Sequence, residues 1–64
     1  MRLFVEPMNA TVVDIDGDGR VNIETEGWST PTLQERRAII YAAENEIAAL
    51  SELIDTLHKA AKPQ

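Results

Sequence analysis

The fold of this chain is decided by residues 31–61, which read PTLQERRAIIYAAENEIAALSELIDTLHKAA. Apolar residues recur here at alternating spacings of three and four, the heptad pattern of a helix that packs on another helix. Pro31 suits a first helical position, and Thr32 with Glu35 fits a capping box. We therefore predict one long amphipathic helix over residues 31–61. Its heptad positions are Leu33, Ile40, Ala43, Ile47, Leu50, Ile54, Leu57 and Ala61.

This helix is too long for the rest of the chain to cover. It spans about 45 Å, whereas strands of five or six residues reach only about 20 Å. Beyond about Glu46 its apolar face has no intramolecular partner. If five large side chains there stay exposed to water, roughly 8 to 15 kcal/mol of stabilisation from their burial is lost. We predict a homo-oligomer, with a dimer favoured and a bent monomer as the alternative. The predicted interface residues are Ile40, Ile47, Leu50, Leu53, Ile54 and Leu57.

Isoleucine and leucine at the heptad positions favour a parallel pair if the geometry is that of a coiled coil. Arg36 at a heptad position and the many alanines weaken that preference. Parallel and antiparallel packing therefore both stay open, as do a trimer and a tetramer.

The first 27 residues show the period-two alternation of β-strands. Residues 2–6 form one β-prone run that Pro7 ends. Residues 11–16 and 20–24 alternate apolar and polar side chains on either side of Gly17-Asp18-Gly19, which is typical of a hairpin. We predict an α+β fold in a single domain, residues 1–64: a short antiparallel β-hairpin or three-stranded meander over residues 1–27, followed by the helix.

A three-residue hairpin loop keeps apolar side chains on one face. It pairs Ile15 with Val21 and Val13 with Ile23, and it places Gly19 in the left-handed conformation that glycine adopts without steric cost. The predicted inner face carries Leu3, Val5, Val13, Ile15, Val21 and Ile23, with Phe4 and Val12 on the outer face.

The hairpin tip resembles the calcium loop of EF-hands and dockerins. Asp14, Asp16 and Asp18 match its first three ligand positions and Gly19 its turn. Thr25 stands where that loop needs a bidentate carboxylate, and no helix follows. We therefore favour an acidic hairpin tip over a calcium site and predict no metal and no cofactor.

Charge is concentrated at this end. Residues 1–27 hold two basic and six acidic side chains, a balance of −4, out of a net charge of −5 for the whole chain. The predicted acidic surface is either a solvated face or a docking surface for a basic groove on a protein partner. Its residues are Asp14, Asp16, Asp18 and Glu24.

A second cluster stands where the strands meet the helix. Free amides, hydroxyls and cations there could hold a small anionic ligand such as a nucleotide. The favoured interpretation is structural, with the arginines paired to Glu24, Glu26 or Glu35 and the tryptophan as a lid on the core. The candidate ligand-binding residues are Trp28, Thr30, Thr32, Arg36 and Arg37.

Composition narrows the function classes. There is no cysteine, and His58 has no partner for catalysis that the sequence can place, so we predict no catalytic residue and no enzyme. The negative net charge argues against direct binding of nucleic acid or anionic lipid. No apolar run is long enough for a signal peptide or membrane span, which favours the cytoplasm.

The sequence is typical of a non-enzymatic oligomeric binding protein that acts on a protein partner through its acidic surface. Small, acidic single domains without cysteine are typical of inhibitors and regulatory accessory proteins such as those of phages. An oligomeric binder of a small anionic ligand and a purely structural oligomerisation module are the alternatives.

Overall fold

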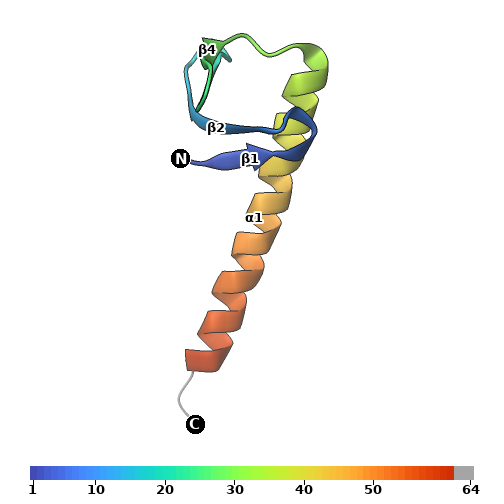
Figure 1. Ribbon diagram of the computed structural model, residues 1–64. Coiled ribbons are helices and arrows are strands. Elements are labelled where there is room, and N and C mark those ends of the chain that lie inside the picture. The colour runs from blue at the N-terminus through green and yellow to red at the C-terminus, as the bar shows by residue number, and fades with distance from the viewer. Residues whose placement is uncertain (62–64) are drawn as a thin grey trace.

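The computed structural model describes residues 1–61, which fold into a four-stranded antiparallel sheet followed by one long helix (Figure 1). The strands follow one another in the order β1-β2-β3-β4, with a short 3₁₀ helix, η1, after β1. The α+β prediction is confirmed. The elements are β1 (Leu3–Val5), η1 (Glu6–Met8), β2 (Ala10–Ile15), β3 (Val21–Ile23), β4 (Gly27–Ser29) and α1 (Leu33–Ala61).

The hairpin loop between β2 and β3 has the predicted geometry. The N–H of Asp16 donates to the carbonyl of Arg20 at 3.1 Å, which closes a loop of three residues. Gly19 is left-handed, with φ of +86°. Ile15 pairs with Val21, as the alternation of side chains predicts.

Asp14 also pairs with Asn22, as the three-residue loop predicts, but beyond Asp14 the predicted register is wrong because β2 carries a β-bulge. The register shifts between Val12 and Asp14, so Ile23 pairs with Val12 and not with Val13. A bulge adds one residue to one strand and reverses the face of every side chain beyond it. Val12 is therefore fully buried, and Val13, expected inside, is only half-buried. Ile15 is 57% exposed although it pairs with buried Val21.

The fourth strand, β4, extends the sheet past residue 27, where the sequence predicted its end. It comprises only Gly27, Trp28 and Ser29, and it pairs with all three residues of β3. Gly27 enters the strand in a left-handed conformation, with φ of +81°. So short a strand carries too little alternation to be detected from sequence.

The core of the described residues is small. Its buried side chains come from the first three strands, and the partly buried Ala38, Ile39 and Ala42 of α1 pack against them. The helix lies closest to β1 and η1, while its C-terminal half projects beyond the sheet (Figure 1). The buried hydrophobic residues are Val5, Val12, Val21 and Ile23.

The helix begins two residues later than the predicted boundary of 31. Thr32 caps it in the predicted capping box: its hydroxyl accepts from the N–H of Glu35 at 3.1 Å, and its own N–H donates to the Glu35 carboxylate at 2.8 Å. The chain measures 51 × 21 × 18 Å and its radius of gyration is 15.1 Å, against about 11 Å for a compact domain of this length. Half the helix thus stands outside the compact part.

Candidate interaction surfaces

The helix α1 has two apolar faces, and the sheet covers only one of them. The covered face carries Ala38, Ile39 and Ala42. The second face, which we call the apolar stripe, lies roughly 110° further round at about 100° per residue. Its six large side chains are between 48% and 64% exposed. The apolar stripe consists of Leu33, Ile40, Ile47, Leu50, Ile54 and Leu57.

The apolar stripe starts closer to the N-terminus than expected. The sequence placed the uncovered half beyond about Glu46 and named Ile40 as the first interface residue; Ile40 is 51% exposed, and Leu33, which was not named as one, is 58% exposed in the half of α1 that the sheet flanks. The sheet packs on the alanine-containing face instead, so the whole stripe is left open. Leu53, predicted in the same interface, lies in line with Ala42 and outside the stripe. It is 51% exposed.

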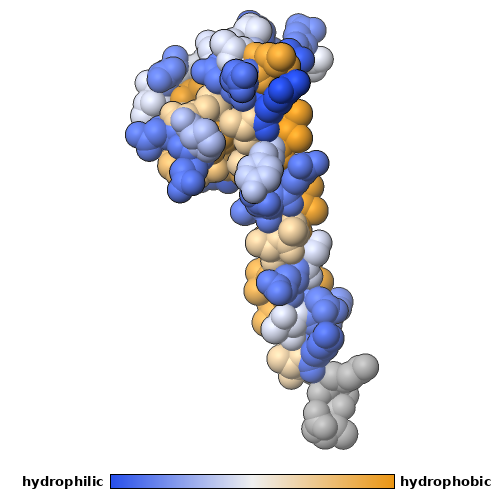
Figure 2. Space-filling model, turned by 90° about the vertical axis from the view of Figure 1, so that its right-hand side faces the viewer, coloured by the Kyte–Doolittle hydropathy of each residue, from blue (hydrophilic) through white to orange (hydrophobic). Residues whose placement is uncertain are grey.

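The chain exposes more area than a compact monomer of its mass, and this excess is large enough to form a protein interface. A folded monomer of 7.1 kDa exposes about 4,100 Å², whereas this structure exposes 5205 Å². The excess of about 1,100 Å² exceeds the roughly 800 Å² that each partner buries in a standard protein interface. Hydrophobic side chains are visible along α1 both beside the sheet and on its projecting half (Figure 2).

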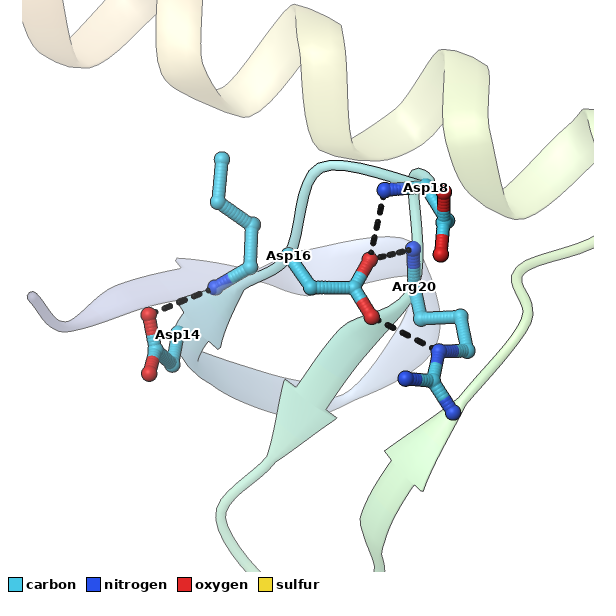
Figure 3. Close-up of polar contacts among 5 residues, drawn as sticks. Asp14, Asp16, Asp18 and Arg20 are labelled. Atoms are coloured by element: carbon cyan, nitrogen blue, oxygen red, sulfur yellow. Dashed lines mark hydrogen bonds and ion pairs between the residues drawn. The ribbon is translucent and has the colours of Figure 1, made fainter.

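At the hairpin tip, the carboxylate of Asp16 joins three donors (Figure 3). One oxygen accepts from the N–H groups of Asp18 and Arg20, both at 2.9 Å, and the other accepts from Arg20 Nε at 2.7 Å. The Arg20 N–H, together with the other donors, holds the pKa of the Asp16 carboxyl below its ordinary value. Asp14 accepts from the N–H of Ile15 at 2.8 Å.

The predicted acidic surface is therefore partly neutralised by the chain itself. Asp16 pairs with Arg20, and Glu24 pairs with Arg2 across the sheet. The Arg2 hydrogen bond lowers the pKa of Glu24. Asp14 and Asp18 have no cation within 4.0 Å among residues 1–61. The sequence pattern located the acids, but the pairing of Arg2 with Glu24 depends on a register that no local motif encodes.

The two edge strands of the sheet each carry an exposed aromatic ring. Phe4 on β1 is 55% exposed and Trp28 on β4 is 46% exposed. Strand pairing places Trp28 beside Asn22, on the side away from the core, so the prediction that it forms a lid on the core is wrong. The Arg20 guanidinium lies 5.9 Å from the Trp28 ring centroid, within the range of a cation–π contact.

The predicted anion site is not assembled as expected. Two amides at the start of α1 are occupied by the capping box of Thr32 and Glu35, whose carboxylate also places negative charge there. The cation over Trp28 is Arg20, not Arg36 or Arg37. Strand β4 and the first turn of α1 are joined by an extended segment that contains Thr30 (Figure 1).

The two arginines of α1 also lack their predicted partners. Within residues 1–61 no acidic oxygen lies within 4.0 Å of Arg36 or Arg37. Glu24 is paired with Arg2, and Glu35 accepts the N–H of Thr32. Both arginines are exposed near the positive end of the helix dipole, an unfavourable position for a cation.

A groove of about 370 Å³ lies between the β1–η1 segment and α1. Phe4 and Tyr41 contribute aromatic surface to it, and Glu6 and Glu46 contribute carboxylates. It lies on the side of α1 away from the apolar stripe. The groove could not be predicted from sequence because its two walls come from segments about 40 residues apart.

A scan of protein-family models and searches of curated proteins and solved structures found no match. Over residues 1–61 no three histidine or acidic side chains are grouped so as to hold a metal ion. In the same part of the chain, no helix combines the length and hydropathy needed to cross a membrane.

Proposed function

We propose that this chain is a non-enzymatic binding protein that works as a homodimer. The observation that carries the proposal is the apolar stripe, which runs the length of a 29-residue helix and remains exposed although the sheet packs on the same helix. Burying one large aliphatic side chain stabilises by roughly 1.5 to 3 kcal/mol. A second copy of the chain supplies a matching stripe by symmetry.

The outer face of the sheet is the surface we assign to a protein partner. Trp28 provides exposed aromatic area there, and tryptophan is among the residues enriched in binding hot spots. Asp14 and Asp18 add negative charge beside it without an intramolecular ion pair over the described residues. These features fit a partner with a basic rim around an apolar pocket, as a small inhibitory or regulatory accessory protein would use.

The mass in solution tests the assembly. We expect the wild-type chain at micromolar concentration to have twice its monomer mass of 7.1 kDa by light scattering or sedimentation. Leu50→Lys should give a monomer, because it buries a charge in the stripe. Ala49→Lys is the matched control: the neighbouring residue faces away from the stripe and should leave the dimer intact. A wild-type monomer overturns the proposal.

The partner surface is tested with a host protein captured on the wild-type chain and then purified. Its affinity should fall at least ten-fold for Trp28→Ala, the range typical of a hot spot. Ser29→Ala, in the same strand but with its side chain on the other face, should bind as the wild type does. Equal binding by both variants contradicts the assignment of the outer face.

A further inference from the structure

We propose that the two chains pair antiparallel through the apolar stripe, so that the arginines of each chain reach the last turn of the other chain's helix. This inference rests on the proposed dimer and adds its orientation, its register and a role for Arg36 and Arg37. Two observations carry it: the composition of the stripe, and two cations that lack an acidic partner over residues 1–61.

The stripe fits itself in one antiparallel register. When Ile47 lies opposite the partner's Leu50, the two-fold axis also places Ile40 opposite the partner's Leu57. Ala43, the small residue of the heptad pattern, then faces the partner's Ile54, so a large side chain fills the space beside a small one. Between Ile40 and Leu57 every large stripe residue meets an apolar residue.

A parallel pair in register is less favourable at two positions. Ala43 would face its own copy, which leaves a void between two small side chains. Arg36 would also face its own copy, which opposes two guanidinium groups in the seam of the interface. In the antiparallel register neither contact is formed.

The antiparallel register also provides a counter-charge for the arginines. Arg36 and Arg37 lie in the first turns of α1, where the helix dipole disfavours cations. In this register they lie beside the partner's Ala61 and the end of the partner's helix. The last four carbonyls of a helix have no intrahelical donor and carry its negative pole, which a cation stabilises. The last turn of α1 also holds His58 and Lys59, and Lys59 is paired with Asp55 of its own helix at 3.1 Å, so the free carbonyls of the turn are the negative groups that the partner's arginines meet.

Charge on the sheets agrees with this orientation. Residues 1–27 have a balance of −4 per chain, and a parallel pair would hold both sheets at the same end. In the antiparallel register the two sheets flank opposite ends, with residue 40 of each chain about 25 Å apart along the axis. That separation exceeds the Debye length of about 8 Å at physiological salt, so the repulsion is screened.

Spin-label distances test the orientation. The chain has no cysteine, so Ser51→Cys and His58→Cys each introduce one labelling site. Both positions are exposed, flank the stripe and stand seven residues apart. The antiparallel register separates the two Ser51 sites by about 8 Å along the axis and the two His58 sites by about 29 Å. A parallel pair gives equal distances at both positions.

The expected result is a dimer whose His58→Cys label pair is about 20 Å farther apart along the axis than its Ser51→Cys pair. A dimer with equal distances overturns the antiparallel inference and leaves the proposed function standing. A wild-type monomer overturns both, and a trimer or larger assembly overturns the two-chain register.

A second variant, Arg36→Gln, should change the dissociation constant of the dimer in opposite directions for the two orientations. In the antiparallel dimer, Arg36→Gln removes a favourable charge at each helix end and should raise the dissociation constant roughly three- to thirty-fold. In a parallel dimer the same change removes a repulsion and tightens the pair. Because glutamine and arginine have similar helix propensities, the helix itself is preserved. Tighter binding by Arg36→Gln overturns the inference.

Discussion

The two apolar faces of α1 differ in the size of their side chains. The face that the sheet covers is built on Ala38 and Ala42, with Ile39 at its edge. The uncovered stripe is built on isoleucine and leucine. Alanine lets a helix backbone approach a sheet closely, whereas large side chains project and need a partner surface shaped to receive them. The more hydrophobic face of a helix is therefore not always the one its own chain buries.

The largest expected effect comes from truncating the uncovered face. Ile54→Ala should cost roughly 2 to 5 kcal/mol per chain in the free energy of unfolding, because it leaves a cavity in the interface of the proposed dimer. The matched control, Thr56→Ala, changes a residue on the other side of the helix and should be nearly neutral. Thermal melts at several protein concentrations check both, since the melting temperature of a dimer rises with concentration. An unchanged stability for Ile54→Ala contradicts the comparison.

Truncation of side chains in β2 tests the bulge, which decides whether Val12 or Val13 is buried. Val12→Ala should cost about 2 to 3 kcal/mol because Val12 is fully buried. Val13→Ala, its neighbour in the bulge, should cost about 1 kcal/mol or less because Val13 is only half-buried. Chemical denaturation of the two variants gives both values. A larger loss at Val13 would show that β2 has the unbulged register predicted from sequence.

Enlarging an alanine should affect one face and spare the rest of the helix. Ala42→Leu should destabilise the chain by roughly 1 to 3 kcal/mol, because the added atoms force the sheet away from α1. Ala49→Leu makes the same substitution beyond the end of the sheet and should change stability by less than about 0.5 kcal/mol. Equal effects at the two positions would mean that the small side chains do not set the distance between sheet and helix.

The smallest effect concerns pH and should be confined to the sheet. Asp16 and Glu24 have pKa values below their ordinary ones, so their pairing stabilises the fold above the unfolded pKa values of about 4. This stability is lost as the pH falls through the lower folded pKa values. Trp28 fluorescence should therefore report weaker resistance to denaturant below about pH 4.

The control for this effect is the double variant Asp16→Asn with Glu24→Gln. It cannot titrate at these positions, so its stability should decline less steeply in acid than that of the wild type. An identical acid profile for the two proteins would show that the ion pairs of the sheet contribute nothing measurable.

Much of the fold could be predicted because its signals are local. Glycines at 17 and 19 with the flanking alternation specify the hairpin loop, and Thr32 with Glu35 specifies the helix start. The bulge could not be predicted, since positions 12 and 13 are both valine and only the pairing of Val12 with Ile23 distinguishes them. Which helix face meets the sheet was missed for a related reason: periodicity finds the most hydrophobic face, not the best-fitting one.

The candidate surfaces show the same difference between local features, which could be predicted, and contacts between distant segments, which could not. The exposed helix residues were identified from their spacing alone, because heptad periodicity is a property of one segment. The neutralisation of Glu24 by Arg2, the position of Trp28 on the outer face and the groove beside Tyr41 depend on contacts between segments distant in sequence. Such contacts leave no pattern within a single stretch of residues.

The strand order β1-β2-β3-β4 has a consequence for how the protein folds. Every strand pairs only with its neighbours in sequence, so contact order within the sheet is low and each chain can form its hairpins quickly. Meeting a second chain is a bimolecular event whose rate depends on how much protein is present. For the proposed dimer, the slow step of folding at low concentration would then be the encounter of two chains, and dilution, not heat, would be the gentlest way to take it apart.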